Sequence, residues 1–205
     1  MTTPLFITAM ILRPVRNTLA ILLVVLLCLL PLSVSAEGKE EALAMLREGK
    51  AVMILRHALA PGIGDPSGFE VGDCSTQRNL NEEGRAQARA WKPFLRRHGI
   101  EQARVLSSQW CRGLDTAVRM DVGEVKEFPP LNSFFGGRGD REMQTRETIE
   151  RVNAMGDGMP IILVSHQVNT TALTGVYPSS NEGVIVRFPL EQGAGVLARI
   201  IPEAE

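Results

Sequence analysis

Short apolar runs alternate with longer amphipathic segments along the chain. The apolar runs predict β-strands at 51–55, 105–106, 125–128, 161–164, 184–188 and 196–201. Segments of helical periodicity predict helices at 40–48, 81–97, 112–120 and 141–155. Because strands and helices alternate, we predict an α/β fold: a three-layer sandwich with a mainly parallel central sheet and helices on both faces.

Two of the chain's three histidines directly follow predicted strands. One strand runs into Arg56-His57, and another runs into Ser165-His166. The carboxyl ends of the strands form the ligand-binding edge of an open α/β sheet, so we expect both imidazoles in one pocket. Arg112 follows the short strand at 105–106 and points to the same edge. Two histidines and two arginines together predict a site for a phosphoryl group.

The segment after His57 differs from the rest of the chain. Residues 58–79 are rich in Gly and Pro and lack periodicity, which predicts a long irregular loop. Loops of this length in compact domains are usually functional or disordered. Since this one begins at the expected pocket, we predict that it takes part in binding.

The predicted helix at 81–97 has clear end signals. Asn81 can cap its N-terminus, and Pro93 predicts a kink inside it. The third histidine, His98, comes at its C-terminal end before a glycine, so we predict a structural role for this residue.

The first 36 residues have the order of a secretory signal peptide. Arg13 and Arg16 precede an uncharged run at 19–32, and small residues at 33–36 supply a cleavage site. A retained membrane anchor is the alternative, but the run is shorter than the roughly 20 residues that span a bilayer. We predict a signal peptide at 1–36, one domain at 37–205 and an exported protein, periplasmic or secreted. Membrane attachment is expected only through an uncleaved leader.

Charge and cysteine content narrow the expected partners and redox state. Removing the leader takes away two of 22 basic residues and none of 23 acidic ones, which leaves a formal charge of −3. This balance gives no reason to expect a nucleic-acid partner.

Cys74 and Cys111 remain after removal of the leader, and an even number of cysteines in an exported protein permits a disulfide. Two buried free thiols are the alternative. We predict the disulfide, because it would tether the long loop next to Arg112.

Four motifs follow one another between residues 51 and 166. They are Arg56-His57-Ala58, the segment Leu80 to Ala88, Ser107-Ser108 with Arg112 and Thr116-Ala117, and Val164-Ser165-His166. In order and spacing they resemble the Arg-His-Gly, Leu-Thr-x-x-Gly-x-x-Gln-Ala, Ser-Ser-x-x-x-Arg-x-x-x-Thr-Ala and Ser-His motifs of the histidine phosphatase superfamily. The resemblance is to the phosphoglycerate-mutase-like branch, and the leader suits an exported, bacterial-type member.

This resemblance implies a metal-independent phosphoric monoester hydrolase that works in two steps through a phosphohistidine. In that scheme His57 is the nucleophile, since a neutral imidazole can attack phosphorus without a separate base. Arg56, Arg112 and His166 bind the phosphoryl oxygens, and His166, protonated beside a phosphate dianion, also counts as catalytic. Permanently charged guanidinium groups suit this task because their planar forks pair with phosphate oxygens.

One departure from the family pattern affects the chemistry. Ser133 stands where the family carries the glutamate that donates a proton to the leaving group, and a serine is no acid at neutral pH. We predict that a carboxylate of the long loop replaces it, with Asp65 ahead of Asp73 and Glu70. The alternative is a substrate whose leaving group needs little protonation, such as a phosphoamidate.

The sequence therefore predicts an exported phosphohydrolase that acts on a small phosphomonoester, a phosphoamidate or a phosphate of the cell envelope. The expected partner is that phosphorylated small molecule or envelope component. No Cys, His or carboxylate group has the spacing of metal ligands, so neither a metal nor another cofactor is expected. A catalytically weak or inactive phosphate-binding pseudophosphatase is the alternative, and Ser133 favours it.

Overall fold

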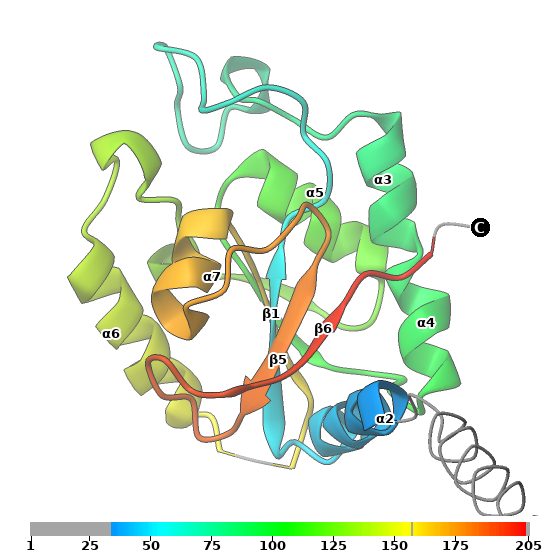
Figure 1. The fold of residues 1–205 in the computed structure, drawn as a ribbon. Helices are drawn as coiled ribbons and strands as arrows, with labels where there is room; N and C mark the ends of the chain where they lie inside the picture. Colours follow the sequence, from blue (N-terminus) through cyan, green and yellow to red (C-terminus); the bar gives the residue numbers. More distant parts are fainter. Residues whose placement is uncertain (1–33, 157, 204–205) are drawn as a thin grey trace, which may run out of the picture. The chain divides into compact units, whose positions relative to one another are not determined.

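The computed structural model describes residues 34–156 and 158–203. A six-stranded sheet lies at the centre of this part, and Figure 1 shows it between the helices. The strands are β1 (Ala51–Arg56), β2 (Arg104–Ser107), β3 (Val125–Glu127), β4 (Ile161–Ser165), β5 (Gly183–Arg187) and β6 (Val196–Ile200). Their order across the sheet is β3-β2-β4-β1-β5-β6. Strands β1 to β4 run parallel to one another, whereas β5 and β6 pair antiparallel at one side.

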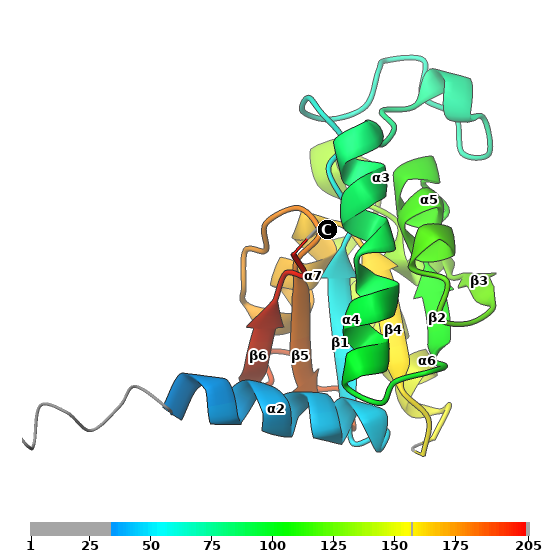
Figure 2. The same cartoon turned by 90° about the vertical axis from the view of Figure 1, so that its right-hand side faces the viewer.

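Helices cover both faces of the sheet, which confirms the predicted three-layer α/β fold with a mainly parallel centre. The α-helices are α2 (Val34–Arg47), α3 (Glu82–Arg89), α4 (Trp91–Arg97), α5 (Cys111–Met120), α6 (Arg141–Asn153) and α7 (Gln167–Thr174). Short 3-10 turns are η1 (Cys74–Thr76), η2 (Pro129–Leu131) and η3 (Phe135–Gly137). Figure 2 shows α3, α4 and α5 over the same face of the sheet.

Alternating side chains of the strands build two apolar layers. Met53 and Leu55 of β1 face a cluster formed with α2, α4 and α5. Val52 and Ile54 face a second cluster, formed with α6, α7 and η2. Strand β1 is buried on both sides, which explains why its sequence is apolar throughout rather than alternating.

The register of the central strands aligns their carboxyl ends. Arg56 of β1 lies opposite Ser165 of β4, and Ser107 of β2 lies opposite Val164. The residues that leave these strands therefore start from the same edge of the sheet. The irregular segment predicted at 58–79 starts there too, and it contains only the short turn η1.

The predicted helix at 81–97 is divided into α3 and α4 at Ala90, within the turn before Pro93, so the interruption predicted from this proline is present. Proline has no N–H to donate, and its ring clashes with the carbonyl of the residue four positions earlier. The helix is therefore interrupted in the turn before the proline. Asn81 caps α3 as predicted, because its side chain accepts a hydrogen bond from the Gly84 N–H at 2.8 Å.

Helix α7 is absent from the sequence-based prediction. Its segment is rich in Asn and Thr, which have low helix propensity, and its amphipathic pattern is weak.

Residues 1–33 of the predicted signal peptide lie outside the described residues, and residues 34–36 form the first turn of α2. In the part of the chain that is described, no helix has the length and apolar character needed to cross a membrane.

Candidate active site

A pocket of about 220 Å³ opens at the edge where β1, β2 and β4 end. Its polar lining comprises Arg56, His57, Asp65, Arg78, Ser133, Arg138, His166 and Gln167, together with Arg112. The structure thus brings together all five residues predicted for the site: Arg56, His57, Asp65, Arg112 and His166.

His57 is held rigidly at the end of β1. Its backbone N–H donates to Ser165 O at 2.9 Å, and its carbonyl accepts from the Asn181 N–H. Its ring Nδ1 lies 2.8 Å from Ala58 O. Because a carbonyl oxygen only accepts, Nδ1 carries the ring proton and Nε2 has a free lone pair. That lone pair accepts a hydrogen bond from Arg112 Nε at 3.2 Å.

The surroundings of His57 keep its ring neutral. Burial lowers the pKa of the imidazole well below its usual value, and the positive charge of Arg112 lowers it further. A neutral ring with Nε2 unprotonated is the form that can attack an electrophile. The side chain is 2% exposed, so a reacting group would meet it inside the pocket and away from bulk water.

Arg112, at the start of α5, is the centre of the polar network. Besides its contact with His57, it pairs end-on with Asp65 through Nη1 at 2.7 Å and Nη2 at 3.1 Å. Its Nη1 also donates to the carbonyl of Arg78. A buried guanidinium held in this way has little freedom to reorient.

Asp65 lies in the pocket as predicted, but as an ion-paired carboxylate. Burial raises the pKa of this carboxyl, while the hydrogen bonds and charge of Arg112 lower it more strongly. Further hydrogen bonds come from Trp110 Nε1 at 3.1 Å and from the Arg78 N–H at 3.3 Å. The net pKa is below the usual value, so Asp65 is ionised at neutral pH. In this arrangement it holds no proton to donate, and its role as the acid stays a prediction.

His166 faces His57 across the pocket, with ring centroids 5.2 Å apart. Its Nε2 is 2.9 Å from Ser108 Oγ, and Trp110 packs edge-on against the ring. Burial, then the neighbouring His57 and Arg112, lower the pKa of His166 well below its usual value. The ring is therefore neutral before an anion binds, whereas the protonated state expected from the sequence requires the nearby charge of a bound dianion.

Two further arginines line the pocket. Arg56 is anchored by Nη1 to Pro178 O at 2.9 Å, and its buried Nε has no hydrogen-bond partner among the described residues. Arg78 is bound by Nε to Gly64 O at 2.8 Å. Burial lowers the pKa of both guanidinium groups, which means that their charge is poorly stabilised. An anion between the two guanidinium groups would stabilise their charges. It would also accept a hydrogen bond from the Arg56 Nε–H, which is otherwise without a partner among the described residues.

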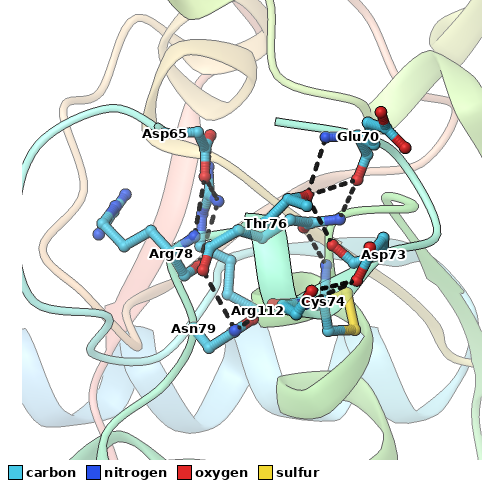
Figure 3. The surroundings of a disulfide bond; sticks show 11 residues. Asp65, Glu70, Asp73, Cys74, Thr76, Arg78, Asn79 and Arg112 are labelled. Atoms are coloured by element: carbon cyan, nitrogen blue, oxygen red, sulfur yellow. Dashed lines mark hydrogen bonds and ion pairs between the residues drawn. A yellow bond between two sulfur atoms is a disulfide. The ribbon is translucent and has the colours of Figure 1, made fainter. Parts of the chain in front are cut away.

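Sequence reasoning missed Arg78 because it lies at the end of the aperiodic loop. The structure joins Cys74 to Cys111 by a disulfide, as predicted, and this bond fixes the loop at the start of α5 (Figure 3). The backbone N–H of Cys111 also donates to Gln77 Oε1 at 2.9 Å. Arg78 directly follows Gln77, and Arg112 directly follows Cys111. The hydrogen bond between Gln77 and Cys111 therefore holds the two arginines next to each other.

The other candidate acids lie away from the pocket. Asp73 caps η1 by accepting from the Ser75 N–H at 2.9 Å. Glu70 is exposed on the loop. Ser133 does line the pocket, and its Oγ accepts from the Phe135 N–H at 3.3 Å. Asp65 is consequently the single carboxylate among the described lining residues.

The third histidine has the structural place predicted for it. His98 is the C-cap residue of α4, and its ring contacts Phe94 and pairs with Glu40 at 3.2 Å. Within residues 34–156 and 158–203, no three His, Cys, Asp or Glu side chains are arranged to hold a metal ion.

No protein-family model and no curated protein sequence matches this chain. Solved structures do. The protein histidine phosphatase SixA complexed with tungstate is 18% identical, with a TM-score of 0.54, over 74% of this chain and 97% of that one. A proposed phosphohistidine phosphatase SixA from Agrobacterium tumefaciens is 18% identical, with a TM-score of 0.52, over 75% and 99% of the two chains. A mycobacterial hydrolase is 15% identical, with a TM-score of 0.51, over 76% and 99%.

These likenesses establish the fold. The chain has the fold of the histidine phosphatase superfamily, as the motifs around His57 and His166 predict.

Proposed function

We propose that this protein is a phosphohydrolase that transfers a phosphoryl group to His57 and then to water. The observation that carries the proposal is the state of His57: a buried, neutral imidazole with its Nε2 lone pair directed at a guanidinium. Three buried or half-buried arginines around it supply the positive charge that a phosphoryl group needs. The shared fold with histidine phosphatases supports the same conclusion.

In the first step, His57 Nε2 attacks phosphorus in line with the leaving group. The N–P bond forms while the P–O or P–N bond to the leaving group breaks, and the leaving group departs with the electron pair. As the substrate enters, a phosphoryl oxygen takes over the hydrogen bond from the fixed Arg112 Nε, which frees the Nε2 lone pair of His57. Arg56 and Arg78 stabilise the charge on the transferred oxygens.

In the second step, a water molecule attacks the phosphohistidine. The P–N bond breaks, its electron pair returns to His57 Nε2, and the product is inorganic phosphate. His166 faces the transferred group from the other side and can share a proton with a phosphoryl oxygen once the dianion raises its pKa. Ser108 fixes the orientation of this ring through its hydrogen bond.

The substrate is one whose leaving group needs little protonation. Asp65 is ionised and bound to Arg112, and Ser133 holds no acidic proton. Aryl phosphates fit this requirement because their leaving group departs as a stabilised phenolate. Phosphoamidates fit it because their basic bridging nitrogen takes up a proton from water before the P–N bond breaks, so that it departs as an amine. An unactivated alkyl phosphate would react slowly in such a pocket.

We also propose that the protein works outside the cytoplasm, on a phosphorylated small molecule or an envelope component. The disulfide supports this location, because such bonds persist in oxidising compartments. The signal-peptide pattern of residues 1–36 supports it independently. Cell fractionation of a tagged full-length chain tests the proposal, and recovery in the reduced cytoplasmic fraction would contradict it.

The test of the mechanism is a phosphoenzyme experiment. The purified protein is exposed briefly to radiolabelled acetyl phosphate, quenched and assayed for phosphate that acid releases and alkali retains. We expect one labelled site in the wild type and none in His57→Ala. Equal turnover by the two proteins would overturn the mechanism.

A phosphate-binding pseudophosphatase is the second candidate, and the Asp65–Arg112 pair is the observation that favours it, since it occupies the guanidinium fork. In that case the protein binds phosphate without forming a phosphoenzyme or turning over any phosphate compound.

A further inference from the structure

The pocket changes character between its floor and its mouth. Histidine and arginine side chains form the floor. At the mouth, the lining residues are mostly apolar or aromatic: Ile63, Phe135, Val168 and Tyr177. A phosphoryl group bound at His57 would therefore place the rest of its molecule against this apolar rim, which we define as these four residues.

The rim is built from separate parts of the chain that meet only in the fold. Ile63 comes from the loop after β1, Phe135 from η3, and Tyr177 from the segment between α7 and β5. The Gly64 backbone beside Ile63 faces the Phe135 ring across a narrow gap. The three side chains are exposed by 93%, 49% and 69% respectively.

This exposure is concentrated at one place. Eight large hydrophobic side chains are exposed in the described part of the chain, and three of them line this single pocket. Scattered exposed hydrophobic residues are ordinary, but a group at the mouth of a pocket indicates a surface that becomes covered when a ligand binds.

Three polar side chains near the rim, those of Ser133, Arg138 and Gln167, each already make a contact within the protein. Gln167 donates to Thr171 Oγ1 at 2.9 Å, and Ser133 Oγ accepts from the Phe135 backbone. The Arg138 guanidinium lies over the Phe69 ring at 4.6 Å and reaches Pro66 O. A sugar or polyol needs several hydrogen-bonding groups directed at its hydroxyls. The described rim offers it few, whereas an apolar group needs none.

We propose that the pocket selects amphiphilic phosphates, in which an apolar group, either an aryl ring or the alkyl part of a phosphoamidate, lies directly next to the phosphoryl group. The cationic floor binds the phosphoryl oxygens, and Ile63, Phe135 and Tyr177 cover the apolar part. This inference rests on the proposed function for the location of the phosphoryl group. It adds the substrate class, which the fold does not specify.

Phosphonates test the proposal without requiring turnover, because their C–P bond is not hydrolysed. We would measure the binding of methyl-, butyl- and phenylphosphonate to the wild-type protein by calorimetry. Each methylene that is covered should tighten binding about two- to fourfold, so butylphosphonate, with three more methylenes, should bind about eight- to sixtyfold more tightly than methylphosphonate. The butyl and phenyl arms distinguish a lipid-like chain from an aromatic ring. Phosphonoacetate, of similar size but polar, should gain nothing.

Matched variants show where the gain arises. Ile63→Ser and Tyr177→Ser should each reduce the ratio of butyl to methyl affinity at least threefold. Ile201→Ser is the control, because Ile201 is 52% exposed but lies outside the pocket lining. It should leave the ratio unchanged.

The outcomes separate this inference from the proposed function. Equal affinity for methyl-, butyl- and phenylphosphonate would overturn the inference while leaving the phosphoryl pocket intact. Tighter binding of phosphonoacetate than of butylphosphonate would overturn it as well. If neither phosphonates nor inorganic phosphate bind, the phosphoryl pocket itself is disproved and the proposed function fails with it.

Discussion

At the scale of single residues, the polar contacts of the pocket converge on Arg112. One guanidinium binds His57, the proposed nucleophile, through Nε and the Asp65 carboxylate through both Nη atoms. The carboxylate opposes the charge of the arginine cluster and fixes the fork. In the proposed mechanism, Asp65 therefore serves to position Arg112, whatever part it takes in proton transfer.

Arg112→Lys tests the importance of this fork. A lysine ammonium keeps the charge beside Asp65 but cannot pair with two oxygens and His57 at once. We expect kcat/KM for p-nitrophenyl phosphate to fall by roughly a hundredfold, about 3 kcal/mol, as for the loss of one preorganised donor. Thermal unfolding should change little, because no buried carboxylate is left unpaired. Wild-type activity in this variant would show that Arg112 plays no part in phosphoryl transfer.

Most residues at the floor of the pocket could be predicted, because the end of a buried strand can be recognised in the sequence as the point where an apolar run stops. Arg56, His57 and His166 each end or follow a buried apolar strand, and parallel strands bring such residues to one edge. Arg78 could not be found in this way, because its position depends on a loop path fixed by a disulfide and by hydrogen bonds. The pairing of Asp65 with Arg112 joins residues 47 positions apart, which no local pattern encodes.

At the scale of elements, α3 packs directly on the chain that leaves the nucleophile. A Cβ atom at Gly84 would collide with the backbone carbonyl of Leu59. The same contact includes a hydrogen bond from the Leu59 N–H to Gln87 Oε1 at 3.0 Å. Gly84 therefore allows the close approach that holds α3 against the first residues of the loop.

Gly84→Ala should push α3 away from Leu59. We expect a loss of about 1–3 kcal/mol in the free energy of unfolding, as for other forced insertions into a packed contact. Urea denaturation measures this change. Gly68→Ala is the matched control, since a Cβ at Gly68 meets nothing within 4 Å. Equal stability of the two variants would show that the α3 contact is loose.

The disulfide closes a separation of 37 residues between Cys74 and Cys111. In the chain-entropy account, a closed loop of this size stabilises the folded state by about 4 kcal/mol. We expect Cys74→Ser/Cys111→Ser to lose stability of this order and to raise KM for p-nitrophenyl phosphate, because Arg78 and Asp65 lose their anchor. The wild type with reductant should behave like the double variant. An unchanged KM in both would show that the loop keeps its place without the bond.

Element boundaries were predictable only where one local signal decided them. The Asn81 cap fixed the start of α3, whereas the break at Ala90 depended on the backbone carbonyl that opposes Pro93 one turn earlier. Helix α7 forms despite its Asn- and Thr-rich sequence, because Ala172 and Leu173 are buried and Leu173 joins the apolar cluster on one face of the sheet. Tertiary packing determined that helix, and packing is invisible in a local window.

At the scale of the whole molecule, two buried histidines make stability depend on pH. His57 and His166 have pKa values below those of the unfolded chain, mainly because of burial. Below pH 6.5, the ordinary midpoint of histidine, the unfolded chain therefore binds more protons than the folded one. Above pH 6.5 both imidazoles are neutral in the folded and the unfolded chain, and the folded state keeps its full stability. As the pH falls towards the lower pKa values of the folded protein, protonation of the unfolded chain reduces that stability.

We expect the melting temperature to be steady between pH 8 and 7 and to fall as the pH drops below about 6.5. Thermal melts followed by circular dichroism across this range measure the effect. In His57→Asn/His166→Asn the fall should be smaller, because neither position can take up a proton. A melting temperature that rises on acidification from pH 6.5 to 5.5 would show that burial does not hold the two rings neutral.

The two walls of the pocket are fixed in different ways, and this has a consequence for how the protein can change. The wall with His57 and His166 belongs to the sheet, where hydrogen bonds between neighbouring strands hold it. The wall with Ile63, Asp65 and Arg78 belongs to an inserted segment that is held at its far end by Cys74. Such a segment can vary in length and composition without shifting the strand register. Over evolution, or by design, the part of the segment around Ile63 can thus change, and with it the apolar rim, provided that Asp65 and Arg78 keep their places beside Arg112.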